Sequence, residues 1–275
     1  MIIAQITDMH VRPAGTLAYD RVSTNSMLEA ALSHLNEMRP RPDVVIATGD
    51  LADGGLPEEY ALLGDMLAVL DMPVFLVPGN HDERAALAGS FPGHAYLPRG
   101  GGFLHYAIDD YPVRLIGLDT VVPGAAGGLM CAERLAWFAA RLAEAPGLPT
   151  LVFMHHPPFA TGVKHMDEIG LAGSEAFAGI VRQHPQIERI VCGHLHRPIQ
   201  LRWHGTLAST APSTAHQVVL DLRHDAPAVF NLEPPACQLH VWDPVQGIVS
   251  HTSYIGRFAG PYPFFPEKAP EKAAE

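Results

Sequence analysis

The sequence predicts a layered α/β fold in which helices cover the sheets, followed by a region rich in β-strands. Three observations support this prediction. Short apolar runs bounded by Pro, Gly, Asp or His alternate with amphipathic helical patterns through the first two thirds of the chain. These runs are apolar at almost every position, as in strands buried on both faces. Beyond about residue 197 the helical periodicity weakens, and strand-like runs follow one another with Pro-rich turns between them.

The elements of the layered part follow from these patterns. The short apolar runs predicted as strands are 2–7, 44–48, 74–77, 115–118, 150–154 and 187–192. Amphipathic stretches between them predict helices at 24–38, 57–70 and 132–144. The second of these opens with Pro57, a residue favoured in the first turn of a helix, and it places Tyr60 and Leu63 on one apolar face. Strands alternating with such helices indicate sheets covered by helices.

The last part of the chain has a different texture. Strand-like runs are predicted at 200–204, 217–222, 238–242 and 249–254. They make residues 201–263 a β-rich extension that could complete a sheet, form a cap over a site or mediate contact with a partner subunit, and the sequence leaves these alternatives open. Residues 264–275 are charged and interrupted by proline, which predicts a flexible tail.

Composition restricts the partners and the compartment. The chain has 275 residues, with 18 Lys and Arg against 29 Asp and Glu, and a formal net charge of −11. A basic surface for a nucleic-acid polymer or an anionic membrane is therefore not expected. The N-terminus lacks the basic and apolar regions of a secretory signal, and no run approaches the ~18 apolar residues of a membrane span. Three scattered cysteines form no disulfide framework, so a cytoplasmic protein is expected.

A series of polar clusters follows the predicted strands. In chain order they are Asp8-Met9-His10, Gly49-Asp50, Gly79-Asn80-His81-Asp82, His155-His156 and Gly193-His194-Leu195-His196. The carboxyl ends of strands in layered α/β folds share one crevice, so these clusters are expected to meet in space. Each cluster alone could be an ordinary turn or a structural histidine. Together, with oxygen and nitrogen donors and no thiolate, they predict a metal site.

This series resembles the sequence blocks of the calcineurin-like metallophosphoesterase superfamily: Asp-x-His, Gly-Asp, Gly-Asn-His-Asp/Glu, a histidine after a strand, and Gly-His-x-His. All of these blocks occur in order over roughly residues 1–200. Residues 154–158, 192–194 and 214–218 are similar to the bacterial class III cyclic-nucleotide phosphodiesterases and glycerophosphodiesterases, a likeness that extends to about residue 260. The resemblance implies a four-layer α/β/β/α sandwich with its catalytic core in residues 1–200 and a C-terminal β-rich extension.

The resemblance also implies a binuclear metal centre. Asp8, His10 and His196 would hold the first ion. Asn80, His155 and His194 would hold the second, and Asp50 would bridge both. His155 is preferred to His156 because the superfamily's ligand precedes a proline by two positions. Such mixed donors accept iron, manganese, cobalt or zinc, and the sequence does not choose among these metals. The neutral oxygen of Asn80 predicts weaker binding at the second site.

The implied reaction is hydrolysis of small phosphodiesters, either 3′,5′-cyclic nucleotides or glycerophosphodiesters, by a metal-bridging hydroxide that attacks phosphorus in line. The implied catalytic residues are Asp50 and His81. His81 would protonate the leaving alkoxide or stabilise the equatorial oxygens, and the alternative is a histidine that only braces Asn80. The implied substrate contacts are Asn80, His81, His196 and His216.

Departures from related subclasses favour diesters. Asp53 stands where purple acid phosphatases carry a tyrosinate, and the Arg-containing stretch of the protein serine/threonine phosphatases is missing after Asp50. A dianionic monoester therefore lacks an obvious clamp, although Arg12 or Lys164 could reach the site.

Asp82 is expected either to orient His81 or to serve in a turn. The alternatives are a non-catalytic scaffold with this fold, or a phosphomonoesterase or nuclease of the superfamily, and the resemblance further implies a homo-oligomer, dimeric or higher.

Overall fold

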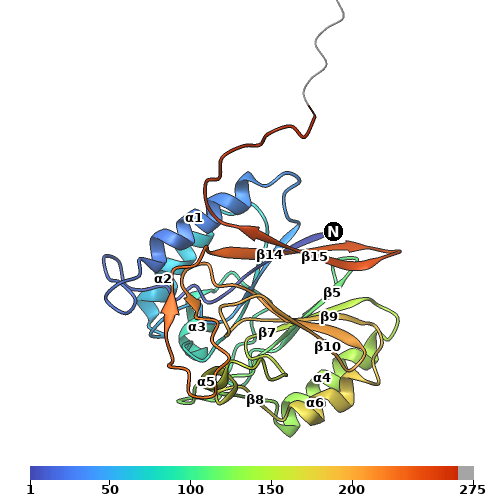
Figure 1. Cartoon of the computed structure of the whole chain (residues 1–275). Helices are drawn as coiled ribbons and strands as arrows, with labels where there is room; N and C mark the ends of the chain where they lie inside the picture. Colours follow the sequence, from blue (N-terminus) through green and yellow to red (C-terminus); the bar gives the residue numbers. More distant parts are fainter. Residues whose placement is uncertain (266–275) are drawn as a thin grey trace, which may run out of the picture.

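The computed structural model describes residues 1–265, so the predicted tail 264–275 lies outside the described residues except for its first two positions. Two mixed β-sheets lie face to face, with helices on the outer face of each (Figure 1). This arrangement confirms the predicted four-layer α/β/β/α sandwich. Within the described residues, no helix has the length and apolar character needed to cross a membrane.

The first sheet has the strand order β15-β14-β1-β2-β3. Its parallel centre consists of β1 (Ile2–Ile6), β2 (Val44–Thr48) and β3 (Val74–Val77). The strand β14 (Ala236–Asp243) pairs antiparallel with β1, and β15 (Gly247–Tyr254) pairs antiparallel with β14. Strands from opposite ends of the chain thus share one sheet.

Helices α1 (Thr24–Glu37) and α2 (Pro57–Leu67) pack on the first sheet, and the short helix α3 (Arg84–Ser90) lies beside α2. Each contributes leucines to the core cluster around β1 and β2, such as Leu28 from α1 and Leu63 from α2, which are fully buried. The amphipathic spacing of these residues is what makes the segments helical against a flat apolar surface.

The second sheet has the order β10-β11-β9-β7-β5-β4. The bounds of its strands are Ile199–Trp203, Thr206–Thr210, Ile187–Cys192, Thr150–Met154, Arg114–Leu118 and Tyr106–Ile108. Its outer face packs against α4 (Ala132–Glu144) and α6 (Ser174–Val181), which bury Phe138 and Phe177 with rings 5.1 Å apart. The short helix α5 (Lys164–Asp167) lies in a connection, as do two small two-stranded pairs. One pair is β6 (Gly128–Leu129) with β8 (Leu171–Ala172), and the other is β12 (Gln217–Val218) with β13 (Phe230–Asn231).

Alternate residues of the second sheet point to different layers. Leu151 and Phe153 belong to the cluster that contains the first sheet, whereas Val152 and Met154 belong to the cluster with α4 and α6. This alternation follows from the period of two of a strand, and it explains why the central strands are apolar at nearly every position.

A polar side chain joins the two sheets below their carboxyl ends. The Nε2 of Gln5 in β1 donates to Thr48 Oγ1 of β2 at 3.0 Å and to the carbonyl of Cys192 in β9 at 2.9 Å. Its Oε1 lies 3.1 Å from His240 Nε2 of β14. Because a buried amide must find partners, Gln5 fixes the relative position of strands whose following loops carry the predicted site.

Most predicted elements of the first two thirds agree with the structure within three residues. The predicted strand 217–222 is wrong beyond its second residue, since β12 spans only Gln217–Val218. Leu220 and Leu222 are exposed and belong to the connection to β13 (Phe230–Asn231). Their apolar side chains are therefore not part of a buried strand.

The edge of the first sheet that is formed by the last strand of the chain is exposed. Strand β15 lies at the edge of the sheet, and several of its residues face solvent. The chain then leaves the body of the fold as an extended segment (Figure 1). Its exposed aromatic side chains are Phe258, Tyr262, Phe264 and Phe265.

Candidate metal centre

The seven predicted ligands lie together in one cluster at the carboxyl ends of β1, β2, β3, β7 and β9. All except Asn80 are buried, and they are Asp8, His10, Asp50, Asn80, His155, His194 and His196. The expectation that strand ends from remote parts of the sequence would meet is therefore fulfilled geometrically.

The predicted first set of ligands surrounds one point. His196 Nε2 lies 3.2 Å from Asp8 Oδ1 and 3.3 Å from His10 Nε2. His10 Nε2 is in turn 3.7 Å from Asp50 Oδ2. Donor atoms at such separations can all contact a single small cation placed between them.

The predicted second set has the same character. His155 Nε2 lies 3.0 Å from Asn80 Oδ1, 3.2 Å from His194 Nδ1 and 3.4 Å from Asp50 Oδ1. The two oxygens of Asp50 therefore point to different sets, Oδ2 to the first and Oδ1 to the second. Asp50 lies where a bridging carboxylate would lie.

Each ligand histidine has its other ring nitrogen beside a fixed oxygen. The pairs are His10 Nδ1 with Asp53 Oδ1 at 3.0 Å, His155 Nδ1 with Thr48 O at 2.8 Å, His194 Nε2 with Ile169 O at 3.1 Å and His196 Nδ1 with His216 O at 2.8 Å. These oxygens only accept, so the outer nitrogens donate and the inner nitrogens of the neutral rings carry lone pairs. Lone pairs facing one another at 3.2–3.3 Å repel, and a cation removes this repulsion. The residues therefore fit a metal centre.

The carboxylates and rings also shift one another's proton affinity. Burial opposes ionisation of Asp8, but the adjacent His196 ring lowers the pKa of Asp8 to about 2. Burial likewise disfavours charge on His155, yet the Asp50 carboxylate raises the pKa of His155 to about 9. Burial, reinforced by His155, lowers the pKa of His194 to about 3. Positive charge is thus favoured between the carboxylates, where metal ions would displace protons.

Several ligands have left-handed backbone conformations that side chains rarely adopt. The φ angles are 51° at Asp8, 46° at His10, 48° at Asp50, 70° at His194 and 47° at His196. Such conformations cost of order 1–3 kcal/mol each when the structure imposes them, and they concentrate at functional sites. They turn the chain sharply after β1, β2 and β9, so that the ligand side chains there point into the cluster.

Asp82 holds in place the turn after β2 and the loop after β3. Its carboxylate accepts hydrogen bonds from the amides of Leu51 at 3.0 Å, Ala52 at 3.0 Å and Gly79 at 2.8 Å, and from Tyr60 Oη at 3.0 Å. Burial raises the pKa of Asp82 to about 6 despite these donors. Of the two alternatives for Asp82, the structure supports the turn: it braces the loops that carry Asp50 and Asn80 and does not contact the His81 ring through any of these bonds.

His81 lies at the edge of the cluster with its ring in a cavity of about 360 Å³. Its Nδ1 donates to the backbone oxygen of Asp53 at 2.8 Å, and its ring packs edge-on against His10 at 4.7 Å. Among residues 1–265, no protein group pairs with His81 Nε2. This nitrogen is therefore available to a bound molecule.

The other predicted histidines have different surroundings. His216 lines the cavity and packs against the His196 ring at 4.6 Å. Its buried Nδ1 has no partner within the described chain. His156 is fully buried behind the cluster, where its ring nitrogens lie 2.7 Å from Thr120 Oγ1 and 3.0 Å from Ala126 O.

Apolar and aromatic residues form the wall of the cavity opposite the cluster. Sequence reasoning did not select them as site residues, because they come from loops, from α5 and from the short pair β12–β13: Tyr19, Met166, Ile169, Val218, Ala228, Val229 and Phe230. The described lining contains no Lys or Arg. Arg12 pairs with Asp53 at 2.6 Å, and Lys164 pairs with Glu168 at 3.3 Å, so neither reaches the cavity.

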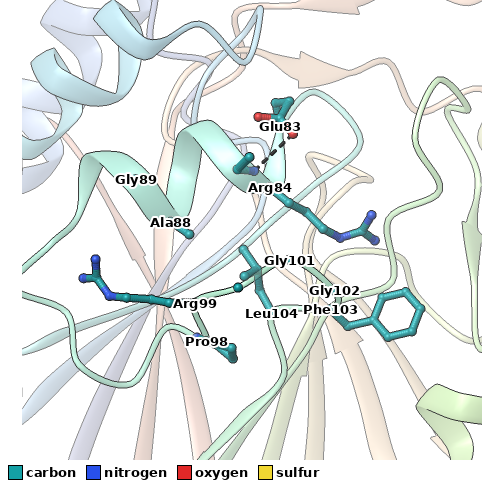
Figure 2. A pocket seen from close by; sticks show the side chains of 12 residues that line it. Glu83, Arg84, Ala88, Gly89, Pro98, Arg99, Gly101, Gly102, Phe103 and Leu104 are labelled. Carbon is teal, nitrogen blue, oxygen red and sulfur yellow. Dashed lines mark hydrogen bonds between the residues drawn. The ribbon is translucent and has the colours of Figure 1, made fainter.

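A larger cavity of about 510 Å³ lies between α3 and the loop 98–104 (Figure 2). It contains none of the predicted site residues. Its Arg84 is neutralised by two hydrogen bonds to Asp119, at 2.5 and 2.8 Å, and Figure 2 shows Arg84 and Arg99 extending toward opposite ends. Because its charged groups do not converge, the smaller cavity over the histidine cluster is the better candidate site.

Comparison with known proteins agrees with this geometry. The family model described as "Calcineurin-like phosphoesterase" matches residues 1–198. The chain is 42% identical over 269 residues to a protein of Arcobacter nitrofigilis named "Probable glycerophosphodiester phosphodiesterase GpdQ", with 98% of each chain covered. It is 34% identical to the glycerophosphodiester phosphodiesterase GpdQ of Enterobacter lignolyticus, covering 95% of this chain and 94% of that one.

More distant similarities are also to proteins named as phosphodiesterases or phosphatases. The chain is 28% identical to the 3′,5′-cyclic adenosine monophosphate phosphodiesterase CpdA of Escherichia coli K12, over 78% of this chain and 76% of that one. A solved dimetal phosphatase from Danio rerio superposes with a TM-score of 0.62 at 17% identity, covering 93% of this chain and 99% of that chain. This last similarity concerns the fold alone.

A methyl group at Gly193 is expected to disrupt the cluster. A Cβ there would lie 2.1 Å from Thr7 Oγ1 and 2.6 Å from Thr48 O, and Thr7 itself hydrogen-bonds Asp8. We expect Gly193→Ala to weaken metal binding by about 10- to 100-fold, measured by metal titration of a variant whose circular dichroism is unchanged. Gly147→Ala, where a Cβ meets nothing within 4 Å, is the matched control. Equal metal affinity in both variants would contradict this account of the site.

Proposed function

The chain belongs to the calcineurin-like phosphoesterase family, and we propose that it hydrolyses small phosphodiesters at the histidine and carboxylate cluster after β1, β2, β3, β7 and β9. The resemblance of the sequence motifs to this family is confirmed by the family model and the relatives. The chain is a metal-dependent phosphodiester hydrolase. The single observation that carries the choice of site is the convergence of buried carboxylates with histidine ring nitrogens that face one another at 3.2–3.3 Å.

We assign Asp8, His10 and His196 to one metal ion and Asn80, His155 and His194 to the other, with Asp50 between them. The separate orientation of the two Asp50 oxygens supports this division. Divalent ions held there would neutralise charge on the phosphate and lower the pKa of a water molecule. Iron, manganese, cobalt and zinc all suit these donors.

The protein's own groups orient the substrate. His81 Nε2 would hold a proton for the leaving alkoxide or hydrogen-bond a non-bridging oxygen, because its Nδ1 is already committed to the Asp53 carbonyl. His216 would contact the substrate from its place in the cavity lining. The wall formed by Tyr19, Val229 and Phe230 would receive the organic part of the diester.

Two features favour diesters of small alcohols. The described cavity lining contains no Lys or Arg, which suits a monoanion better than a dianion. The relatives that match over nearly the whole chain are named as glycerophosphodiester phosphodiesterases, whereas the cyclic-nucleotide phosphodiesterase of E. coli matches over about three quarters. Glycerophosphodiesters are therefore the first substrates to test, and cyclic nucleotides the second.

Metal removal tests the function directly. We expect the purified protein to hydrolyse bis(p-nitrophenyl) phosphate, chelation to abolish this activity, and added Mn²⁺ or Zn²⁺ to restore it.

Titration of the chelated protein should show two binding steps, with the weaker one at the Asn80 set because a neutral amide oxygen binds a cation less strongly than a carboxylate. Asp50→Ala should lose both steps, while exposed Asp65→Ala should keep them. A chain that binds two ions and hydrolyses no diester would instead be the non-catalytic scaffold.

Substitution of His81 separates its two possible roles. If the ring acts on the substrate, His81→Ala should lower kcat by roughly 10²–10⁴-fold with two metal ions still bound. Metal content by mass spectrometry and initial rates on glycerophosphocholine provide the measurements, with exposed His251→Ala as the control. Near-normal turnover would assign His81 to bracing Asn80.

We also propose that the chain associates with itself through its exposed sheet edge. Strand β15 contains no Lys, Arg or Pro, the residues that usually protect an edge from pairing, and the aromatic segment with Phe258 and Phe264 follows it. Sedimentation should give a dimer or larger species, and Val249→Lys at the edge should dissociate it, whereas Val69→Lys on another surface should not. A wild-type monomer would rule out this association.

A further inference from the structure

One cation lies close to the metal cluster without reaching its cavity. Arg12 follows His10 by two positions, and its side chain is one third exposed. The guanidinium donates from Nη1 to Asp53 Oδ2 at 2.6 Å. The Asp53 side chain is 14% exposed, so the pair is partly shielded from solvent. Because the two charges of this ion pair cancel, it contributes little net positive charge to the cavity.

The same aspartate contacts the two nearest groups of the site. Its Oδ1 accepts from His10 Nδ1 at 3.0 Å, and its backbone oxygen accepts from His81 Nδ1 at 2.8 Å. The distance from Asp53 Oδ1 to His81 Nδ1 is 3.8 Å. A single carboxylate therefore separates the Arg12 guanidinium from the rings that border the cavity.

The backbone keeps this arrangement in register. Val11 pairs with Ala52 in an isolated bridge, and the amide of Asp53 donates to the carbonyl of Val11 at 3.0 Å. The amide of Arg12 donates to Asn25 Oδ1 at 3.0 Å. Because both backbones are fixed, only the side-chain pair decides which way the guanidinium points.

We propose that Asp53 is a specificity determinant that withholds Arg12 from the substrate and thereby disfavours phosphomonoesters. This inference rests on the proposed diesterase function. A phosphomonoester carries close to two negative charges at neutral pH, whereas a diester carries one. A free guanidinium beside the cavity would bind the extra charge, as arginine does wherever phosphate is held by two hydrogen bonds. With Asp53 in place, that charge meets no Lys or Arg in the described lining.

The substitution Asp53→Asn isolates this effect. The amide oxygen of asparagine can still accept from His10 Nδ1, so the ring stays oriented, whereas its NH₂ group cannot accept from Arg12. Arg12 is then released beside His81. The measured quantity is the ratio of kcat/KM for p-nitrophenyl phosphate to that for bis(p-nitrophenyl) phosphate, compared at equal metal content because loss of metal lowers both rates.

We expect this ratio to rise by about tenfold or more in Asp53→Asn and to return to the wild-type value in the double variant Asp53→Asn with Arg12→Met. The rise should shrink as salt concentration increases. The matched control is Asp71→Asn, which frees the surface cation Arg41 far from the site and adds the same charge, and its ratio should equal that of the wild type.

Three results would overturn the inference: an unchanged ratio in Asp53→Asn, a rise that persists without Arg12, or an equal rise in Asp71→Asn. The wild-type arm tests the proposed function separately. If the wild type hydrolyses no diester with metal bound, the diesterase proposal fails. If it does hydrolyse diesters and the ratio does not move, only the role of Asp53 fails.

Discussion

The site depends on one electrostatic constraint: imidazole nitrogens that carry lone pairs face one another and two carboxylates inside a buried cluster. The constraint exists because the outer ring nitrogen of each ligand histidine donates a hydrogen bond to an oxygen that only accepts, such as Thr48 O for His155 and Ile169 O for His194. Without cations the cluster must bind protons instead, as the raised pKa of His155 indicates. Divalent cations held at these positions would displace those protons.

Holding this cluster requires backbone conformations that the chain would not adopt alone. Asp8, Asp50 and His194 lie in the left-handed region. Asp82 accepts hydrogen bonds from the amides of Leu51 and Gly79, which braces the turn that carries Asp50. The Gln5 network below fixes the strands from which these turns begin. Rigid sheets and braced turns together define the ligand positions.

The sequence was sufficient to predict the layered fold and the residues that meet at the strand ends, because both depend on short patterns: apolar runs, helical spacing and polar clusters after strands. It was insufficient where tertiary contacts decide. The segment 217–222 has strand-like composition, yet Leu220 is exposed in a connection. The cavity wall at Tyr19 and Phe230 has no motif, since only the folded chain brings these loops together.

The aspartates around the cluster show why residue type alone does not assign a role. Asp8 and Asp50 face the inward ring nitrogens, Asp53 faces a guanidinium and a ring N–H, and Asp82 faces backbone amides. The same carboxylate therefore has the geometry of a ligand, a charge-neutralising partner or a brace according to the donors presented to it. Those donors come from strands and loops far apart in the chain. A motif can identify which carboxylates lie near a site, but only their surroundings distinguish what each contributes.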